Sequence, residues 1–285
     1  MSVSLIEWTE QTWNPFVGCT KVSAGCENCY AIRQAARIER MGIAPHYDGV
    51  TTKTGLGREN WSGKISLASE RIWALPKRLK SGSVVFVNSM SDFFHPAAED
   101  AMRDRALGAI GSRPDVTFQI LTKRPEQVAP YLARTVQTLP PNVWLGATVE
   151  CAATLHRVQT LASIPASVRF LSFEPMLEDV ATAGLDTSQV DWVIAGGESG
   201  PSARPMSADW VRALRDACSS SSTPFFFKQW GKYSNNPLVR DEAGRIRPVS
   251  MLRHMDPHGK GGALLDGRLV RELPVLSGRH VAEGG

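Results

Sequence analysis

The chain has 285 residues, of which 42% are hydrophobic and 21% charged, so it can bury a large core and is neither disordered nor fibrous. Its formal net charge of +4 permits a nucleic-acid partner without requiring one, because no run of Lys and Arg concentrates the charge. No apolar stretch approaches the roughly 20 residues of a membrane span, and the first ten residues lack the pattern of a signal peptide. We therefore expect a cytoplasmic protein without a membrane partner.

Short apolar segments alternate with amphipathic ones along most of the chain. The first helix is expected to begin at Cys29 and to end near Gly42. The Gly- and Thr-rich residues 43–66 predict an insertion, and a helix around 69–80 follows it. The repeated strand–helix units after that helix predict a parallel sheet, open or closed into a barrel. The expected strands are 84–88, 116–121, 143–148, 168–173, 191–195 and 224–228, and the expected helices lie near 98–110, 125–135, 151–163 and 207–219.

The residues after Trp230 are polar and rich in Gly, with short strands expected near 244–249 and 268–273. We interpret them as an appendage to the sheet rather than as an independent domain. The predicted organisation is a βα barrel over 1–233, with a cysteine loop at 14–30 and the insertion at about 43–66, followed by a C-terminal appendage over 234–285.

Three of the five cysteines, Cys19, Cys26 and Cys29, lie within eleven residues, in one Gly-containing loop just before the first helix. An odd number of cysteines in a cytoplasmic chain argues against a disulfide framework. Three thiolates from one loop can hold a [4Fe–4S] cluster and leave one iron open to a non-protein ligand. The alternatives are a structural zinc site with His46 or His95 as the fourth ligand, and three thiols that bind no metal.

Polar side chains recur where the expected strands end, and the carboxyl ends of parallel strands meet at one edge of a sheet. A buried polar ligand needs such a set, although a single carboxylate there more often caps a helix or pairs with a cation. The run GGESG at 196–200 lacks the spacing of a dinucleotide-binding loop. The candidate residues are Asn88, Ser89, Asp92, Thr122, Lys123, Thr148, Glu150, Ser172, Glu174, Gly196, Gly197, Glu198, Lys228, Gln229 and Trp230, together with Tyr30 beside the last loop cysteine.

The other aromatic and basic residues are open to two interpretations. Trp61 and Trp230 fall in expected loops and could stack on a base, whereas Trp8, Trp13, Trp144 and Trp192 are expected in the core. His254 and His258 are spaced like metal ligands, but they lie in the polar tail and are more often plain surface residues. A solvated surface accounts for most arginines, although some could contact phosphates: Arg113, Arg124, Arg204, Arg240, Arg245, Arg247 and Arg253.

Six motifs resemble a phage- and bacteria-associated three-cysteine-motif family, which is similar to radical S-adenosylmethionine (SAM) enzymes: WNPFVGCTKVSAGCENCYA, FVNSMSDFFH, LTKRPEQ, LSFEPML, DWVIAGGESG and FFFKQWG. Most radical SAM enzymes have a three-residue first gap between the cysteines and an aromatic residue before the last one. Here the gap is six residues, with Asn28 before Cys29 and Tyr30 after it. More distantly, Ser91-Asp92-Phe93 and Thr122-Lys123 are similar to strand ends in the spore photoproduct lyase branch, which repairs DNA.

The resemblance implies a radical SAM enzyme on a partial or full TIM-like βα barrel, with a [4Fe–4S] cluster on the three loop cysteines. The open iron would bind SAM, and reduction would cleave it to a 5′-deoxyadenosyl radical. The strand-end residues would hold SAM, with Glu150 or Glu174 suited to its amine or ribose and Lys123 to its carboxylate. Gly196-Gly197-Glu198 looks like the Gly-Gly-Glu that holds the SAM amine in those enzymes, but it follows a late strand rather than the second.

The partners implied by the resemblance are an electron donor, a nucleic-acid base or nucleotide as substrate, and a neighbouring partner protein. The alternative function is a zinc-stabilised or iron–sulfur nucleic-acid-binding module without SAM chemistry. The two differ in whether the protein cleaves SAM under reduction.

Overall fold

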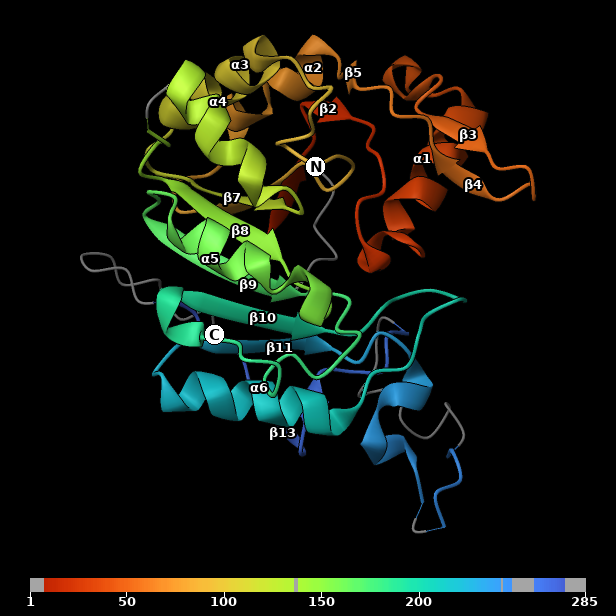
Figure 1. The fold of residues 1–285 in the computed structure, drawn as a ribbon. Coiled ribbons are helices and arrows are strands. Elements are labelled where there is room, and N and C mark those ends of the chain that lie inside the picture. The colour runs from red at the N-terminus through yellow and green to blue at the C-terminus, as the bar shows by residue number, and fades with distance from the viewer. Residues whose placement is uncertain (1–7, 136–137, 242, 248–258, 275–285) are drawn as a thin grey trace.

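The structure is a computed structural model that describes residues 8–135, 138–241, 243–247 and 259–274. Its centre is a seven-stranded parallel sheet in the order β1-β6-β7-β8-β9-β10-β11 (Figure 1). After β1, the strands lie side by side in the order in which the chain forms them, as in a βα barrel rather than a doubly wound sheet. Because β1 and β11 are the two edges, the sheet is a half-barrel. The expectation of an α/β fold with a partial barrel is confirmed.

The elements follow the expected alternation closely. The helix expected at 69–80 is interrupted, because Pro76 has no N–H to continue it, and the residues after α2 form a 3-10 helix, Leu75–Arg78. No described helix is long and apolar enough to cross a membrane. The sheet contains β1 (Gln11–Trp13), β6 (Val84–Val87), β7 (Thr117–Thr122), β8 (Val143–Thr148), β9 (Val168–Phe173), β10 (Trp192–Gly196) and β11 (Phe225–Gln229), and the helices are α1 (Tyr30–Met41), α2 (Glu70–Trp73), α3 (Asp100–Gly111), α4 (Val128–Arg134), α5 (His156–Ala162) and α6 (Ala208–Ser220).

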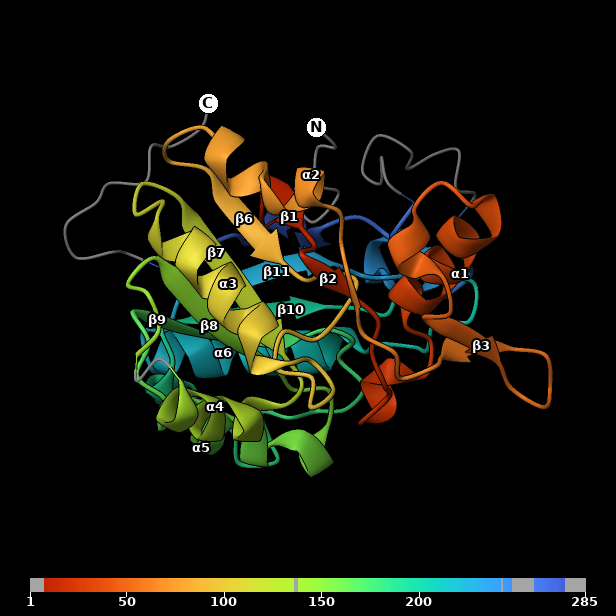
Figure 2. The same ribbon diagram turned by 90° about the horizontal axis from the view of Figure 1, so that it is seen from above.

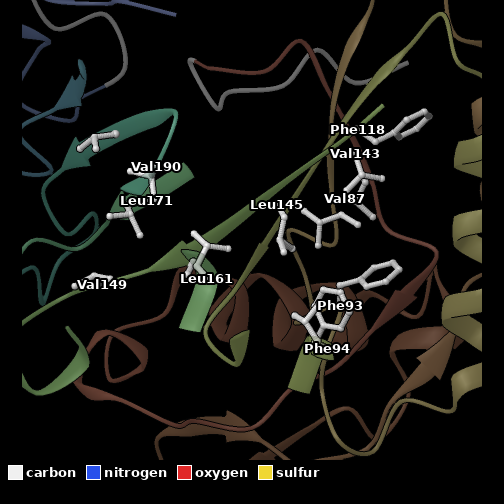
Figure 3. Packing of buried hydrophobic residues seen from close by; sticks show 14 of the residues in the cluster. Val87, Phe93, Phe94, Phe118, Val143, Leu145, Val149, Leu161, Leu171 and Val190 are labelled. Carbon is white, nitrogen blue, oxygen red and sulfur yellow. The ribbon is translucent and has the colours of Figure 1, made fainter. Parts of the chain in front are cut away.

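The outer face of the sheet forms the main core. Alternate residues of each strand point to it, among them Val87 on β6, Leu145 on β8 and Leu171 on β9. Apolar residues of α3, α4, α5 and α6 cover this face, for example Leu161 of α5 (Figure 3). Since both faces of each strand are covered, the strands are continuous apolar runs in the sequence.

Aromatic rings fill the inner face towards the amino ends of the strands. Trp192 is at the centre of this cluster, with ring centroids 6.0 Å from Trp144, 5.9 Å from Phe226 and 6.2 Å from Trp8. A side chain at Gly146 would lie 2.4 Å from the ring of Phe170, so the glycine leaves room for that ring. Most polar residues of the inner face lie towards its carboxyl end, whereas Gln119 is in register with Phe86 and Trp144 of the aromatic cluster.

The insertion and α1 form a lobe beside the carboxyl ends of the strands (Figures 1 and 2). Ala31, Ile32 and Ala35 of α1 pack with Tyr47 and Trp61 in a separate small core. The helix ends at Gly42, whose left-handed φ of 63° suits a glycine C-cap. The insertion contains the hairpin of β3 (Thr51–Lys53) and β4 (Glu59–Trp61), and β5 (Ser66–Leu67) pairs with β2 (Phe16–Val17). Trp61 is therefore a buried strand residue, and its expected loop position is wrong.

The C-terminal tail covers the free edge of β11. Phe227 N donates to Val270 O at 2.7 Å, and Glu272 N donates to Phe225 O at 3.0 Å. Covering an edge in this way removes a site of unwanted strand pairing. The strand expected at 268–273 is reduced to β13 (Arg268–Leu269), which pairs with β12 (Leu264–Leu265), and the strand expected at 244–249 lies partly outside the described residues. The division of the chain at residue 233 stays a prediction.

Candidate functional site

The three loop cysteines are free thiols between β2 and α1. Cys26 ends a short 3-10 helix, Ala24–Cys26, and Cys29 directly precedes α1. Burial raises the pKa of Cys19 to about 12. Burial also raises the pKa of Cys29, and the backbone N–H groups of Ala31 and Ile32 at the start of α1 oppose that rise. These two thiols therefore carry protons at neutral pH, and a metal that binds them must displace the protons.

Arg124, two residues beyond β7, holds the first segment of the loop. It donates to the carbonyl and hydroxyl oxygens of Thr20 at 2.9 and 2.8 Å and to Cys19 Sγ at 3.8 Å. Asp92, beyond β6, pairs with Arg124 at 3.0 Å and accepts from Thr122 Oγ1 at 2.6 Å. Since Arg124 and Asp92 are both nearly inaccessible to solvent, their pairing fixes the loop near Cys19.

Glu150, two residues beyond β8, holds the middle segment. Its carboxylate accepts from Ser23 Oγ at 2.7 Å and pairs with Lys123 at 2.8 Å and Arg157 at 3.0 Å. The carboxylate has no exposed surface. Although burial raises the pKa of Glu150, Lys123 and its other partners outweigh burial and lower the pKa, so the group is ionised. Gly25 is required here, because a side chain at this position would lie 2.5 Å from Glu150 Cγ.

Glu198, two residues beyond β10, holds the segment before Cys29. It accepts from Asn28 Nδ2 at 2.9 Å and pairs with Arg204 at 2.5 Å. Arg204 also donates to the carbonyl oxygen of Ala24 at 2.9 Å. Burial raises the pKa of Glu198, but the hydrogen bonds that it accepts from Arg204 and Asn28 outweigh burial and lower the pKa. Residues beyond four strands of the sheet thus support three successive segments of the cysteine loop.

The other candidates lie at the same edge of the sheet. Tyr30 Oη donates to Ser89 O at 3.1 Å, and Lys228 pairs with Glu174 at 2.5 Å. A side chain at Gly197 would lie 2.1 Å from Trp230 O, so the ends of β10 and β11 approach closely there. Trp230 directly follows β11, as expected, but it is fully buried in the main core and donates to Leu264 O at 3.0 Å, so its ring is not free to stack on a base.

Several buried polar atoms on the inner face have no hydrogen-bond partner among the described residues. Strand register places Asn88, Gln119 and Ser172 on this face, at most 2% exposed. Buried polar groups are nearly always satisfied, so each of these calls for water or a bound group. Gln119 was missed by the sequence reasoning; its signal is a carboxamide within the apolar run VTFQIL. The unpartnered atoms of this edge are Asn88 Nδ2 and Oδ1, Gln119 Nε2 and Oε1, Ser172 Oγ, Glu174 Oε1 and Gln229 Oε1.

Three thiols on one loop are the ligand type that an iron–sulfur cluster uses. Within the described parts of the chain, no three His, Cys, Asp or Glu side chains are arranged to hold a single metal ion. A [4Fe–4S] cluster does not need ligands that converge on one point, because each cysteine binds a different iron. The surrounding cations exceed the carboxylates by one, which suits anionic thiolates: they are Lys123, Arg124, Arg157, Arg204 and Lys228 against Asp92, Glu150, Glu174 and Glu198.

The histidines considered as a fourth zinc ligand have other contacts. His95 shares a hydrogen bond with Thr20 Oγ1 at 2.9 Å, and its Nδ1 accepts from Ala97 N at 3.1 Å. His46 packs against the ring of Tyr47 at 4.8 Å. His254 and His258 lie outside the described residues.

Most of the arginines considered for phosphate contacts have partners within the protein. Arg113 pairs with Asp115 at 2.8 Å, and Arg124 and Arg204 support the cysteine loop. Arg245 pairs with Asp241 at 2.9 Å on the surface, Arg240 donates to Gly244 O at 3.0 Å, and Arg247 N donates to Val239 O at 2.6 Å. Arg253 lies outside the described residues.

Two solved structures are similar to this chain. One is spore photoproduct lyase complexed with dinucleoside spore photoproduct, at 12% identity and a TM-score of 0.43, covering 76% of this chain and 62% of that one. The other is a cysteine-to-serine mutant of spore photoproduct lyase, at 13% identity and a TM-score of 0.43, covering 92% of this chain and 77% of that one. The chain thus spans less than two thirds of the first structure's length.

A comparison with curated proteins found no match. Residues 3–274, nearly the whole chain, match the model of a family described as "Protein of unknown function (DUF5131)". The chain belongs to this DUF5131 family.

Proposed function

We propose that the chain is a radical SAM enzyme that acts on a nucleic-acid base or nucleotide. One observation carries the proposal. Three free thiols lie on one loop, and residues beyond β6, β7, β8 and β10 support that loop at the carboxyl edge of the half-barrel. Enzymes built on βα barrels place their chemistry at this edge.

Cys19, Cys26 and Cys29 are the residues that would hold a [4Fe–4S] cluster, with one iron left for SAM. When bound, the cluster and SAM supply reductive cleavage of SAM and, through it, hydrogen abstraction from a substrate. The protein's task is to orient both groups, to exclude water and to accept an electron from an external donor.

Polar residues on the inner face are suited to SAM. Glu174 Oε1 lacks a partner among the described residues and is an acceptor for a cationic amine. The open amide of Asn88 and hydroxyl of Ser172 match ribose or carboxylate oxygens. The glycines at the end of β10 allow close approach of Glu174 and of the backbone at Trp230, which brings these strand ends together. Tyr30, Ser89, Lys123, Thr148, Glu150, Glu198 and Lys228 complete the proposed surroundings.

The nucleic-acid substrate is supported by the motif resemblance to a DNA-repair branch. The separate resemblance of six motifs to a radical-SAM-like, phage- and bacteria-associated family also supports it. A substrate assay tests this proposal.

The test is anaerobic purification of the wild-type chain, followed by a visible spectrum and by iron, sulfide and zinc analysis. We expect a brown protein with about four irons per chain and, after reduction with dithionite, release of methionine and 5′-deoxyadenosine from SAM. Cys19→Ala, Cys26→Ala and Cys29→Ala should each lose iron and colour. Cys151→Ala is the matched control, because its thiol is also buried and contacts Thr154 Oγ1 rather than the loop.

The proposal is overturned by a colourless protein with stoichiometric zinc that cannot be reconstituted with iron. A brown protein that neither binds nor cleaves SAM would overturn the enzyme and favour the binding module.

A further inference from the structure

Four exposed cations on the lobe of α1 and the insertion have no ion pair among the described residues. They are Arg33 and Arg37 on α1, Lys53 on β3, and Arg58 just before β4. Some other surface arginines are paired, for example Arg105 with Glu70 and Arg134 with Asp100. The four are therefore available to an anion from outside the chain.

The acidic residues of the lobe do not neutralise these cations. Residues 30–66 contain six Lys and Arg against three Asp and Glu, so this short region carries most of the net charge of +4. Glu39 accepts from Gly49 N and Thr51 Oγ1 within the lobe, and Glu59 pairs with Arg40 at 2.6 Å. The remaining acidic residue is Asp48.

The cations lead to the candidate site. At Gly200, in the loop after β10, an added side chain would lie 2.3 Å from Arg33 Nη2, so the Arg33 guanidinium lies against that loop. Tyr30, one turn earlier on α1, is bonded to Ser89 beyond β6 and is 47% exposed. The first turn of α1 thus reaches across the carboxyl edge of the sheet. Arg37 continues the strip one turn further along α1, and the hairpin that carries Lys53 and Arg58 packs on the same helix.

We propose that Arg33, Arg37, Lys53 and Arg58 form a phosphate-binding strip that guides a nucleic-acid strand to the site. A series of cations that lack internal partners matches the regular charges of a sugar–phosphate backbone. The half-exposed ring of Tyr30 adjoins the strip at the site end, where a base can stack on it. The inference rests on the proposed nucleic-acid substrate, but binding can be measured without reducing the protein or adding SAM.

The test is fluorescence anisotropy of a labelled 20-nucleotide DNA strand with the full-length holoprotein, between 50 and 300 mM KCl. A duplex and an RNA of the same sequence are parallel arms. The variant changes the four strip residues to Gln. Each lost phosphate contact reduces the slope of log affinity against log salt by about 0.7, so we expect a reduction of roughly 3. Affinity at 0.1 M salt should fall by at least roughly tenfold.

The chain offers a matched control. Arg71, Lys77, Arg78 and Lys80 are also exposed and without an ion pair in the described structure, but they lie on and just after α2 and the following 3-10 helix rather than on the lobe. Changing these four to Gln alters the net charge equally and should leave the slope unchanged. If the fourfold strip variant fails to fold, Arg37→Gln with Arg58→Gln should show about half of the effect.

The proposal is overturned if wild-type protein binds none of the three nucleic acids, or if both fourfold variants lose affinity equally. It is also overturned if poly-glutamate binds as tightly as DNA and is lost in the same variant. SAM cleavage tests the proposed function separately. The anisotropy measurement can be interpreted even if the protein does not cleave SAM.

Discussion

Arg124 Nη1 lies 3.8 Å from Cys19 Sγ and donates a hydrogen bond to that sulfur. The same nitrogen is 3.0 Å from Asp92 Oδ2. The sulfur of a candidate cluster ligand is therefore next to a cation whose charge is partly balanced by a carboxylate. Hydrogen bonds to sulfur and nearby charges set the reduction potential of iron–sulfur clusters, so this pair would adjust the potential of the proposed cluster.

Arg124→Gln is expected to lower the midpoint potential of the cluster, because reduction adds negative charge that the guanidinium stabilises. Asp92→Asn is expected to raise it, because the cation then loses its counter-charge. Each shift should be on the order of 50 mV, close to a tenfold change in equilibrium constant for one electron. The measurement is a redox titration followed by electron paramagnetic resonance. Shifts of the same sign in both variants would mean that the residues act only through the shape of the loop.

Glu150→Gln is expected to destabilise the apo-protein by about 3 kcal/mol, because it leaves Lys123 and Arg157 without their carboxylate. Urea unfolding followed by circular dichroism gives the change in the free energy of unfolding. Glu70→Gln is the control, since Glu70 pairs with Arg105 at the surface and its loss should have a much smaller effect. Equal effects would contradict the role of the buried carboxylate.

Gly25→Ala is expected to reduce iron incorporation several-fold. The added methyl group would lie 2.6 Å from Glu150 Oε1, so either the carboxylate or the loop must move. Gly55→Ala is the control, because no atom lies within 4 Å of the methyl group it would add. Iron content per chain after identical reconstitution is the measurement. Full iron content in Gly25→Ala would show that the loop can accommodate the added methyl group.

Stability is expected to fall as the pH drops below about 6.5. Burial and then Arg124 lower the pKa of His95 to about 4, whereas the unfolded chain protonates this histidine near its usual value of 6.5. Between these values the unfolded state binds more protons, so stability decreases by on the order of 2–3 kcal/mol. Protonation of Nδ1 would also break the bond from Ala97 N. Thermal unfolding at pH 7 and pH 5 is the measurement, and His95→Asn should flatten the dependence.

The sequence predicted the sheet well because its inner strands are covered on both faces and are therefore continuous apolar runs. β1 was not predicted, since Gln11–Trp13 has only three residues and obtains its conformation from pairing with β6. The hairpin of β3 and β4 was also missed, because its Thr, Gly and charged residues show no apolar alternation. The hairpin is stabilised instead by its contacts with α1, which precedes it in the chain.

The sequence predicted that the polar residues lie at the carboxyl ends of the strands, but it did not reveal their partners. Asp92, Lys123, Glu150 and Glu198 were expected to hold SAM, and in the structure their bonds go to the cysteine loop, to each other or to neighbouring arginines. A pairing such as Ser23 with Glu150 joins residues 127 positions apart, and only the fold determines it. Whether these groups also contact SAM stays a prediction.

The supports of the cysteine loop consist entirely of protein groups: two buried carboxylates, a guanidinium and the side chains that they bind. These contacts do not include a metal, so folding of the sheet would shape the loop without the proposed cluster. Iron would then bind to cysteines that are already positioned, replacing their thiol protons without having to organise the chain. If oxygen destroyed the proposed cluster, the loop would keep its conformation and the protein could be reconstituted with iron.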